Sequence, residues 1–364
     1  MIRRTWIPKS GGGQRGLGIP DVIDRIVQQA VHRVLSRHYE RTFHGSSHGF
    51  RPERSCHSAI AEAKGYVAEG LSTVVSVDLS KFFDRVNHQR LLARLSQRVG
   101  DGRVLKLIHR MLKAKVVMPD GTRVSSDEGT PQGGPLSPLL SNIVLDELDW
   151  ELERRGLRFV RYADDFMIFT RTSEAARRVF ESVERYLTRK LKLVVNRQKS
   201  HVCSTDGVEF LGFLFVGYGG QIRVSAKNTR KFKDRVREIT RRNRGVSMTH
   251  RYQELRRYFQ GWVGYFQLVP IKSFFSELDK WVRRRIRSCY WKQWRRPRTR
   301  IVNLRKLGVG KDEAVTHGIS SKGPWVMSAS QAVHQALSVD YLSARGLASL
   351  LEIWTKLAAK KRTA

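Results

Sequence analysis

The sequence is poor in cysteine and in acidic residues, and it has no long apolar run. Its three cysteines, Cys56, Cys203 and Cys289, lie far apart, with no CxxC pair and no histidines at metal-ligand spacing, which excludes a disulfide framework or a zinc site. No apolar run approaches the roughly 18 residues that a spanning helix needs, and Met1–Ser10 lacks the apolar region of a secretory signal. We therefore expect reduced thiols in a cytoplasmic protein without a membrane partner.

The shortage of acids makes the chain strongly basic. Lysine and arginine total 68 against 33 aspartates and glutamates, which gives a formal net charge of +35. Because such a surface repels itself unless a polyanion is bound, nucleic acid is the expected partner. The 364 residues are enough for two or three compact units.

Apolar patterning predicts an α+β fold, with a mainly antiparallel sheet backed by helices. A glycine-rich basic loop at 9–16 precedes apolar residues at helical spacing. Runs rich in β-branched and aromatic residues predict strands. The expected strands are 73–77, 158–162, 166–170, 208–216 and 221–225, and a further helix is expected at 175–190.

The composition changes after about Ser225. Between Lys227 and Arg300 there are 23 lysines and arginines but 5 acids, on segments with helical apolar periodicity. This pattern predicts a basic helical domain at 226–300. A shorter helical unit is expected from 301 to 364.

Three aspartates lie where apolar strands end. Asp164 and Asp165 occupy the expected hairpin turn, and Asp78 follows the strand at 73–77. A polar turn alone would explain an isolated pair of aspartates. Clustered carboxylates, however, cost several kcal/mol unless a cation compensates, and hard oxygen ligands suit two Mg²⁺ ions acting in phosphoryl transfer. The three acids therefore predict a nucleotidyl-transfer site.

The chain resembles bacterial group II intron reverse transcriptases of the endonuclease-free class C type, which also act as splicing maturases. Seven blocks occur in that family's order, and 257–266 is similar to its maturase or thumb segment. The blocks lie at 7–20, 47–52, 77–84, 129–138, 162–165, 196–200 and 210–213. Relatives carry an extension ahead of the first block, so this chain is expected to be N-terminally short.

The resemblance implies a right-hand polymerase. Fingers and palm are expected at 1–225, a maturase or thumb domain at 226–300, and a small helical DNA-binding domain at 301–364. The implied reaction is RNA-directed DNA synthesis with two Mg²⁺ ions, for which Mn²⁺ is an acceptable substitute. The implied partners are an RNA template, a DNA or RNA primer, deoxynucleoside triphosphates and a structured group II intron RNA.

Roles in the site follow block by block. Asp78 and Asp164, with the Leu79 carbonyl, resemble the ligands of both ions, and Asp165 is expected beside the ion that activates the primer 3′-hydroxyl. Phe83 matches an aromatic gate that would exclude a 2′-hydroxyl, although a core phenylalanine is the alternative. The resemblance also implies contacts with the incoming nucleotide. Lys9 and Arg15 are expected to bind the triphosphate, with a solvated basic loop as the alternative. Gln132 is expected to contact the sugar, and Lys199 is expected near the leaving pyrophosphate.

Other basic and aromatic residues are candidates for nucleic-acid contact. Arg51 is assigned to it, with a structural ion pair as the alternative. Trp291 and Trp294 lie among basic residues and are expected to touch nucleic acid directly. The remaining candidates are Arg284, Arg285, Lys292, Arg295 and Arg296.

Two further functions stay open at this stage. One is a maturase role that stabilises folded intron RNA, alone or beside polymerisation. The other is recruitment of an intron-type enzyme by its host for repair or antiviral defence.

Overall fold

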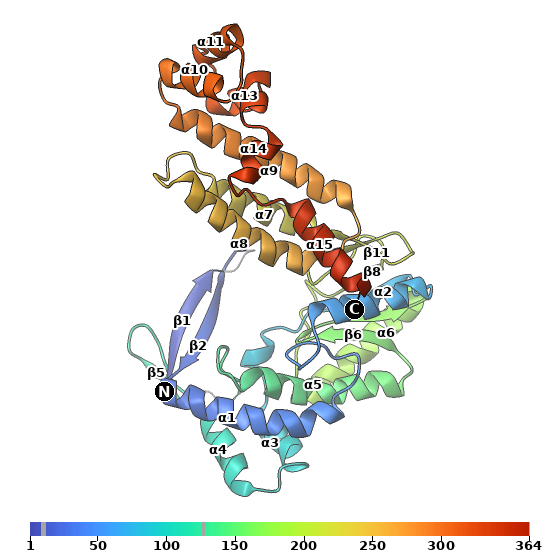
Figure 1. Ribbon diagram of the computed structural model, residues 1–364. Helices are drawn as coiled ribbons and strands as arrows, with labels where there is room; N and C mark the ends of the chain where they lie inside the picture. The colour runs from blue at the N-terminus through green and yellow to red at the C-terminus, as the bar shows by residue number, and fades with distance from the viewer. Residues whose placement is uncertain (9–11, 126–127, 364) are drawn as a thin grey trace. The chain divides into compact units, whose positions relative to one another are not determined.

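The computed structural model describes residues 1–8, 12–125 and 128–363 and divides into two compact units (Figure 1). Unit 1 comprises Met1–Leu211 with Phe215–Gln221, and unit 2 comprises Gly212–Leu214 with the chain from Ile222 onward. The result is the expected mixture of a strand-containing unit and a helical unit.

Unit 1 alternates strands and helices. The strands are β1 Ile2–Pro8, β2 Gln14–Pro20, β3 Thr73–Val77, β4 Val116–Val117, β5 Arg123–Val124, β6 Arg158–Tyr162, β7 Asp165–Thr170, β8 His201–Ser204 and β9 Glu209–Phe210. The helices are α1 Val22–Tyr39, α2 Cys56–Ala68, α3 His88–Ser96, α4 Gly102–Leu112, α5 Ser137–Arg154 and α6 Ser173–Tyr186, with short helical turns at Glu40–Thr42, Phe82–Asp84 and Leu187–Leu191.

The central sheet of unit 1 has the order β6-β7-β3-β8, with antiparallel neighbours. Its strands are rich in valine, isoleucine and phenylalanine, which suit a pleated buried surface. Helix α6 packs on this sheet, and its N-terminus is capped by Thr172, whose hydroxyl accepts from the Ala175 N–H. The core of unit 1 lies between the sheet and its helices.

The N-terminal segment contains a hairpin that the sequence did not reveal. β1 and β2 pair antiparallel from Ile2 opposite Pro20 to Pro8 opposite Gln14, and Figure 1 shows them next to the start of α1. Of the β1 side chains, Ile2 alone is buried. Because the rest of the strand is partly or fully exposed, it lacks the apolar alternation by which strands are recognised.

Unit 2 is built mainly from helices. Strands β10 Phe213–Val216 and β11 Gln221–Val224 form a three-stranded sheet with β9, and the division between the two units passes through this sheet. The helices are α7 Ala226–Ile239, α8 Met248–Phe266, α9 Lys272–Gln293, α10 Pro297–Lys306, α11 Lys311–Gly318, α12 Pro324–Met327, α13 Gln331–Ala336, α14 Val339–Ala344 and α15 Leu350–Thr363.

The helices of unit 2 share one core. Side chains before and after residue 300 belong to the same buried cluster, as Phe275 and Trp354 illustrate by stacking with ring centroids 5.7 Å apart. The chain divides into two compact units, and the expected boundary between a maturase or thumb domain and a C-terminal domain at about residue 300 stays a prediction. A DNA-binding role for the segment 301–364 also stays a prediction.

Two simpler expectations can be compared directly with the structure. Within the described part of the chain, none of the three cysteines takes part in a disulfide. Among the described residues, none of the helices combines the length and the apolar character that crossing a bilayer requires.

A buried arginine joins the hairpin β6–β7 to the rest of unit 1. The side chain of Arg161 is fully buried and forms an ion pair with Asp149 on α5, with 2.5 Å between Nη2 and Oδ2. It also donates to Asn142, to the Ser47 hydroxyl at 2.7 Å, and to the carbonyl of Ala163 at 2.9 Å. All five N–H groups of the guanidinium can be satisfied by these partners.

This arrangement makes Arg161 a connection between three parts of the chain. Asp149 and Asn142 are on helix α5, Ser47 is in the 46–49 segment, and Ala163 is in the turn that follows β6. A buried charge without its partner is strongly destabilising. The position of the turn therefore depends on the Arg161–Asp149 pair.

The pair makes a prediction about stability. Asp149→Asn should lower the free energy of unfolding by about 3–5 kcal/mol, because the guanidinium of Arg161 stays buried without its counter-charge. Glu153→Gln, one turn further along α5, removes the exposed partner of His44 and should cost less than about 1 kcal/mol. Urea denaturation of both variants measures the difference, and equal losses would contradict a buried, structural pair.

Candidate active site

Strand pairing brings the three predicted aspartates to one end of the central sheet. In the antiparallel pair β3–β7, Val77 lies opposite Phe166, so the next positions along, Asp78 and Asp165, are neighbours across the strands. The turn between β6 and β7 consists of Ala163 and Asp164, and Asp165 is the first residue of β7. Within the described part of the chain, no three histidine, cysteine, aspartate or glutamate side chains are close enough to hold a metal ion.

The turn that carries Asp164 has an uncommon backbone. Ala163 has φ of 58°, a left-handed conformation that side chains other than glycine seldom adopt. Its carbonyl accepts from Arg161, and a Cβ on Gly49 would lie 2.2 Å from its nitrogen. Only glycine at position 49 allows this close approach, so the 46–49 segment holds the turn from one side.

The 46–49 segment is itself fixed by hydrogen bonds. His48 donates its backbone N–H to the Arg161 carbonyl at 2.8 Å, and its ring Nε2 lies 2.6 Å from Glu62 on α2. Burial raises the pKa of Glu62, but hydrogen bonds with His48, Ser46 and Tyr66 outweigh it and hold the pKa below its usual range. The carboxylate of Glu62 thereby anchors the segment to α2.

The backbone of Asp78 is held by the segment that follows α6. The Asp78 N–H donates to the Ser200 hydroxyl at 2.9 Å, and its carbonyl accepts from the Asn196 N–H at 2.8 Å. Ser80 donates to the Val194 carbonyl at 2.8 Å. These hydrogen bonds lie on either side of Leu79, and the Leu79 carbonyl oxygen is not an acceptor in any of them.

Lys199 lies in the same segment and contacts Asp78. Its Nζ is 3.8 Å from Asp78 Oδ2, and the two side chains are 68% and 33% exposed. At that exposure the pair contributes little to stability. The expected role of Lys199 at the pyrophosphate is not tested by this contact and stays a prediction.

The loop that contains Gln132 is tied to Phe83 and to β2. Thr130 donates its N–H to the Phe83 carbonyl at 2.6 Å, and Gly18 donates to the Gln132 carbonyl at 2.7 Å. A Cβ on Gly129 would lie 2.9 Å from the Phe83 carbonyl, so this position requires glycine. The predicted sugar-binding and gate residues thus belong to one connected backbone framework.

The side chain of Phe83 is half-buried and packs edge-on against Phe82, with ring centroids 5.3 Å apart. It lies in a short helical turn that follows Lys81, whose φ is 49°. Both the gate and the core alternatives are compatible with this position. Arg15 lies on β2 opposite Ile7, and Lys9 falls outside the described residues.

Arg51 is a structural residue, which corrects its assignment to nucleic acid. Its side chain is 5% exposed and pairs with Glu40 at 2.8 Å. It also donates to the carbonyls of His44 and Ser47 at 2.5 and 2.7 Å. These partners occupy the guanidinium, so the alternative of a structural ion pair is the correct one.

The two tryptophans expected to touch nucleic acid are buried, and that expectation is wrong. Trp291 is 0% exposed and Trp294 is 8% exposed, both within the core of unit 2. Their helical phase on and after α9 points them inward, although their sequence neighbours are basic. Of the other candidates, Lys292, Arg295 and Arg296 are exposed, while Arg284 and Arg285 are partly buried.

Sequence reasoning missed Arg161, Asp149 and Gly49 as residues that shape the site. A signal was available, because Arg161 interrupts an apolar strand and Asp149 lies on an apolar stretch of α5. Charges in such positions are seldom buried unless they are paired. The partner of each could not be identified from spacing alone.

The donor set is chemically suited to Mg²⁺. Carboxylate and carbonyl oxygens are the hard ligands that this ion prefers, and Asp78, Asp164 and Asp165 are all at least partly accessible. The oxygen of Leu79 lies outside the neighbouring backbone pairing and is a fourth donor of the same type. The residues present therefore suit magnesium by donor type, although the described side chains as they stand do not form a three-ligand cluster.

Comparison with solved structures supports the fold. The chain resembles apo telomerase from Candida tropicalis with a TM-score of 0.54 and 12% identity, over 100% of this chain and 65% of telomerase. It resembles the same enzyme in complex with a fragment of telomeric RNA with a TM-score of 0.54 and 14% identity, over 98% and 64%. At these identities the likeness concerns the fold.

Comparison with curated proteins gives relatives that are longer than the matched region. The chain is 35% identical to Protein YkfC of Escherichia coli over 254 residues, which are 59% of this chain and 65% of YkfC. It is 29% identical over 305 residues to the group II intron-encoded protein LtrA of Lactococcus lactis, covering 66% of this chain and 49% of LtrA. The chain thus spans less than two thirds of either relative.

Two family descriptions match most of the chain. Residues 7–215 match "Reverse transcriptase (RNA-dependent DNA polymerase)", and residues 229–308 match "Group II intron, maturase-specific domain". The first covers all three aspartates of the site, and the second covers α8 and α9. The chain contains a reverse transcriptase domain followed by a maturase domain, and it belongs to the group II intron reverse transcriptase/maturase family.

Proposed function

We propose that this protein is an RNA-directed DNA polymerase of group II intron type that extends a primer on an RNA template. The observation that carries the proposal is the β3–β7 register, which makes Asp78 and Asp165 neighbours beside the turn that contains Asp164. The proposed right hand has fingers at about 1–71 and 89–128, a palm around the three acids, a thumb at 226–300 and a DNA-binding segment at 301–364.

Within the site, each proposed role belongs to a specific group. Asp78 and Asp164, with the Leu79 carbonyl, would hold two Mg²⁺ ions, and Asp165 would lie beside the ion nearer the primer. When bound, such ions stabilise the attacking and leaving oxygens of a phosphoryl transfer, and Mn²⁺ is an acceptable substitute. The chain itself orients the acids through the Arg161 contacts and the Asp78 backbone bonds.

The incoming deoxynucleoside triphosphate would be bound by residues from three segments. Lys9 and Arg15 would neutralise the triphosphate as an ammonium and a forked guanidinium. Gln132 would contact the sugar, and Lys199 would donate a proton to the leaving pyrophosphate. Hydrogen bonds join the Gln132 loop to β2, which carries Arg15, and to Phe83, and they support a nucleotide-binding role for this part of the set.

A second function, binding of a group II intron RNA as a splicing maturase, is favoured by the maturase-specific domain at 229–308. The excess of lysine and arginine in this region suits neutralisation of phosphates. RNA helices are recognised largely by shape and backbone. The same unit could therefore serve both the template–primer duplex and a folded intron.

Loss of one proposed metal ligand should abolish polymerisation. Asp164→Ala should reduce primer extension on an RNA template at least about a thousandfold, because several kcal/mol of transition-state stabilisation are lost. Asp120→Ala, which removes an exposed turn carboxylate, is the control and should keep wild-type activity. Equal incorporation by wild type and Asp164→Ala would overturn the polymerase assignment.

The same variant separates the two proposed functions. Splicing of a group II intron RNA by Asp164→Ala should be retained, since RNA binding needs no metal ligand at this turn. Loss of both activities in a folded protein would mean that the acids serve the RNA-bound state and not catalysis alone.

Phe83 should control the choice of sugar. Phe83→Ala should raise ribonucleotide incorporation relative to deoxynucleotides by about tenfold or more, because the ring no longer excludes a 2′-hydroxyl. Single-nucleotide insertion with paired ribo- and deoxynucleoside triphosphates measures the ratio. Phe82→Leu, at the buried neighbouring position, is the control and should leave the ratio unchanged. If Phe83→Ala also leaves the ratio unchanged, Phe83 is a core residue only.

A further inference from the structure

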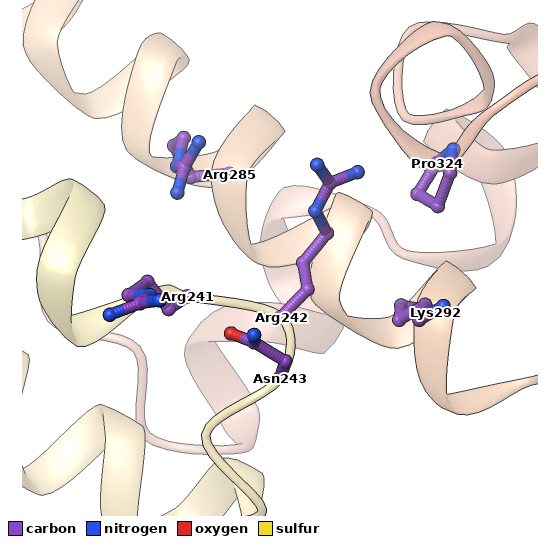
Figure 2. A pocket seen from close by; sticks show the side chains of 6 residues that line it. All are labelled: Arg241, Arg242, Asn243, Arg285, Lys292 and Pro324. Atoms are coloured by element: carbon purple, nitrogen blue, oxygen red, sulfur yellow. The ribbon is translucent and has the colours of Figure 1, made fainter.

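Unit 2 contains a pocket of about 460 Å³, which brings two of the expected nucleic-acid contacts, Arg285 and Lys292, together with cations that the sequence did not single out. It is lined by Arg241, Arg242, Asn243, Arg285, Lys292 and Pro324. Figure 2 shows these six side chains around the pocket, with Arg242 extending from the loop after α7 and Lys292 extending from α9. We propose that this pocket binds a phosphate of a nucleic-acid backbone, a proposal that deepens the nucleic-acid-binding role of the helical unit.

The lining is entirely one-sided in charge. Four of its six residues are cations, contributed by the 241–243 loop and by α9, and the lining includes no acid. Arg241, Arg242 and Lys292 are exposed, and their side chains make no hydrogen bond or ion pair with another described residue. Bringing such groups together without an anion is unfavourable.

Acids near the pocket are already paired with other arginines. On α7, Asp234 binds Arg237 and Glu238 binds Arg235, each at 2.6 Å. At the start of α8, Glu254 binds Arg244 at 2.7 Å. The pocket cations are therefore not neutralised by the carboxylates around them.

The carbonyl end of α7 is also occupied. The Ile239 carbonyl accepts from Arg244 at 3.0 Å and from Arg251 at 2.8 Å. The Thr240 carbonyl accepts from Arg285 at 3.3 Å. Since these bonds satisfy the partial negative charge at the helix end, Arg241 and Arg242 are not needed as capping residues.

The walls of the pocket are held in place. Arg285 donates from Nε to the Thr240 hydroxyl at 2.9 Å. Burial lowers the pKa of the Arg285 guanidinium, and the nearby charges of Arg242 and Arg237 lower it further. Trp325 follows the lining residue Pro324 and is held by Arg284, whose guanidinium lies 4.2 Å from the Trp325 ring centroid and donates to the Trp325 carbonyl at 3.4 Å.

A phosphate is the anion that best matches this lining. Guanidinium groups present forked donors that fit phosphate oxygens, and an ammonium adds a point charge. The Asn243 amide supplies a neutral donor of the kind that contacts backbone phosphates or sugars. Two sources carry the same group, the template–primer duplex and a folded RNA.

The test is a binding measurement with the full chain in EDTA and without nucleotides. Arg241→Gln combined with Arg242→Gln removes two pocket charges that make no structural contact. This double variant should weaken binding about tenfold or more near physiological salt and should reduce the slope of log Kd against log salt by about one to two. A short RNA–DNA hybrid and a folded stem-loop RNA, measured separately, identify the source of the phosphate.

A charge-matched control uses the other end of α7. Lys227→Gln combined with Arg230→Gln also removes two exposed charges and should change the affinity less than about threefold. Equal weakening by the two double variants would overturn the pocket and leave only a diffuse positive field. Competition by polyglutamate as effective as competition by RNA would also overturn it, in favour of an acidic protein partner.

The outcome is independent of polymerase activity. Asp164→Ala should bind both nucleic acids like the wild type, because EDTA removes divalent ions from the assay. If primer extension fails in every variant while the Arg241/Arg242 double variant alone loses affinity, the pocket stands and the polymerase assignment falls.

Discussion

The buried ion pair between Arg161 and Asp149 is the constraint on which the geometry of the candidate active site depends. Two charges at 0% exposure are stable only when every donor and acceptor around them is satisfied. Arg161 meets that condition by binding α5, the 46–49 segment and the carbonyl of Ala163 at once. The turn that carries Asp164 is therefore positioned by the interior of unit 1 rather than by its own sequence.

The surrounding elements extend this constraint to the other acids. Strand β7 begins at Asp165 and pairs with β3, which ends one residue before Asp78. The Ser200 hydroxyl and the Asn196 N–H fix the Asp78 backbone from the opposite side. Such rigidity suits the proposed metal site, because carboxylates that are brought together repel one another in the absence of cations.

Much of this could be predicted from sequence, where local signals are strong. The strands around Asp164 and the strand before Asp78 have dense β-branched and aromatic runs, and their predicted bounds agree with β3, β6 and β7 within one residue. The hairpin β1–β2 was missed because its side chains lack apolar alternation. Arg51, Trp291 and Trp294 were misassigned because composition does not reveal which face of a segment turns inward.

In the helical unit the distinction between paired and unpaired arginines is informative. Most arginines near the end of α7 bind acids or backbone carbonyls, whereas Arg241 and Arg242 line a pocket without an acid. Sequence shows only a general excess of positive charge there, because pairing depends on tertiary contacts. The structure thus separates arginines that stabilise the fold from those available to a ligand.

The central claim, that Asp78, Asp164 and Asp165 form a divalent-metal site, can be tested without any assay of activity. Fe²⁺ substituted for Mg²⁺ and exposed to ascorbate and peroxide cleaves the backbone next to its binding site, and the cut positions can be mapped by mass spectrometry. We predict cleavage within Val77–Ser80 and Ala163–Phe166, suppressed by excess Mg²⁺ and lost in Asp164→Ala. Cleavage confined to other segments, or unaffected by Mg²⁺, would contradict the account.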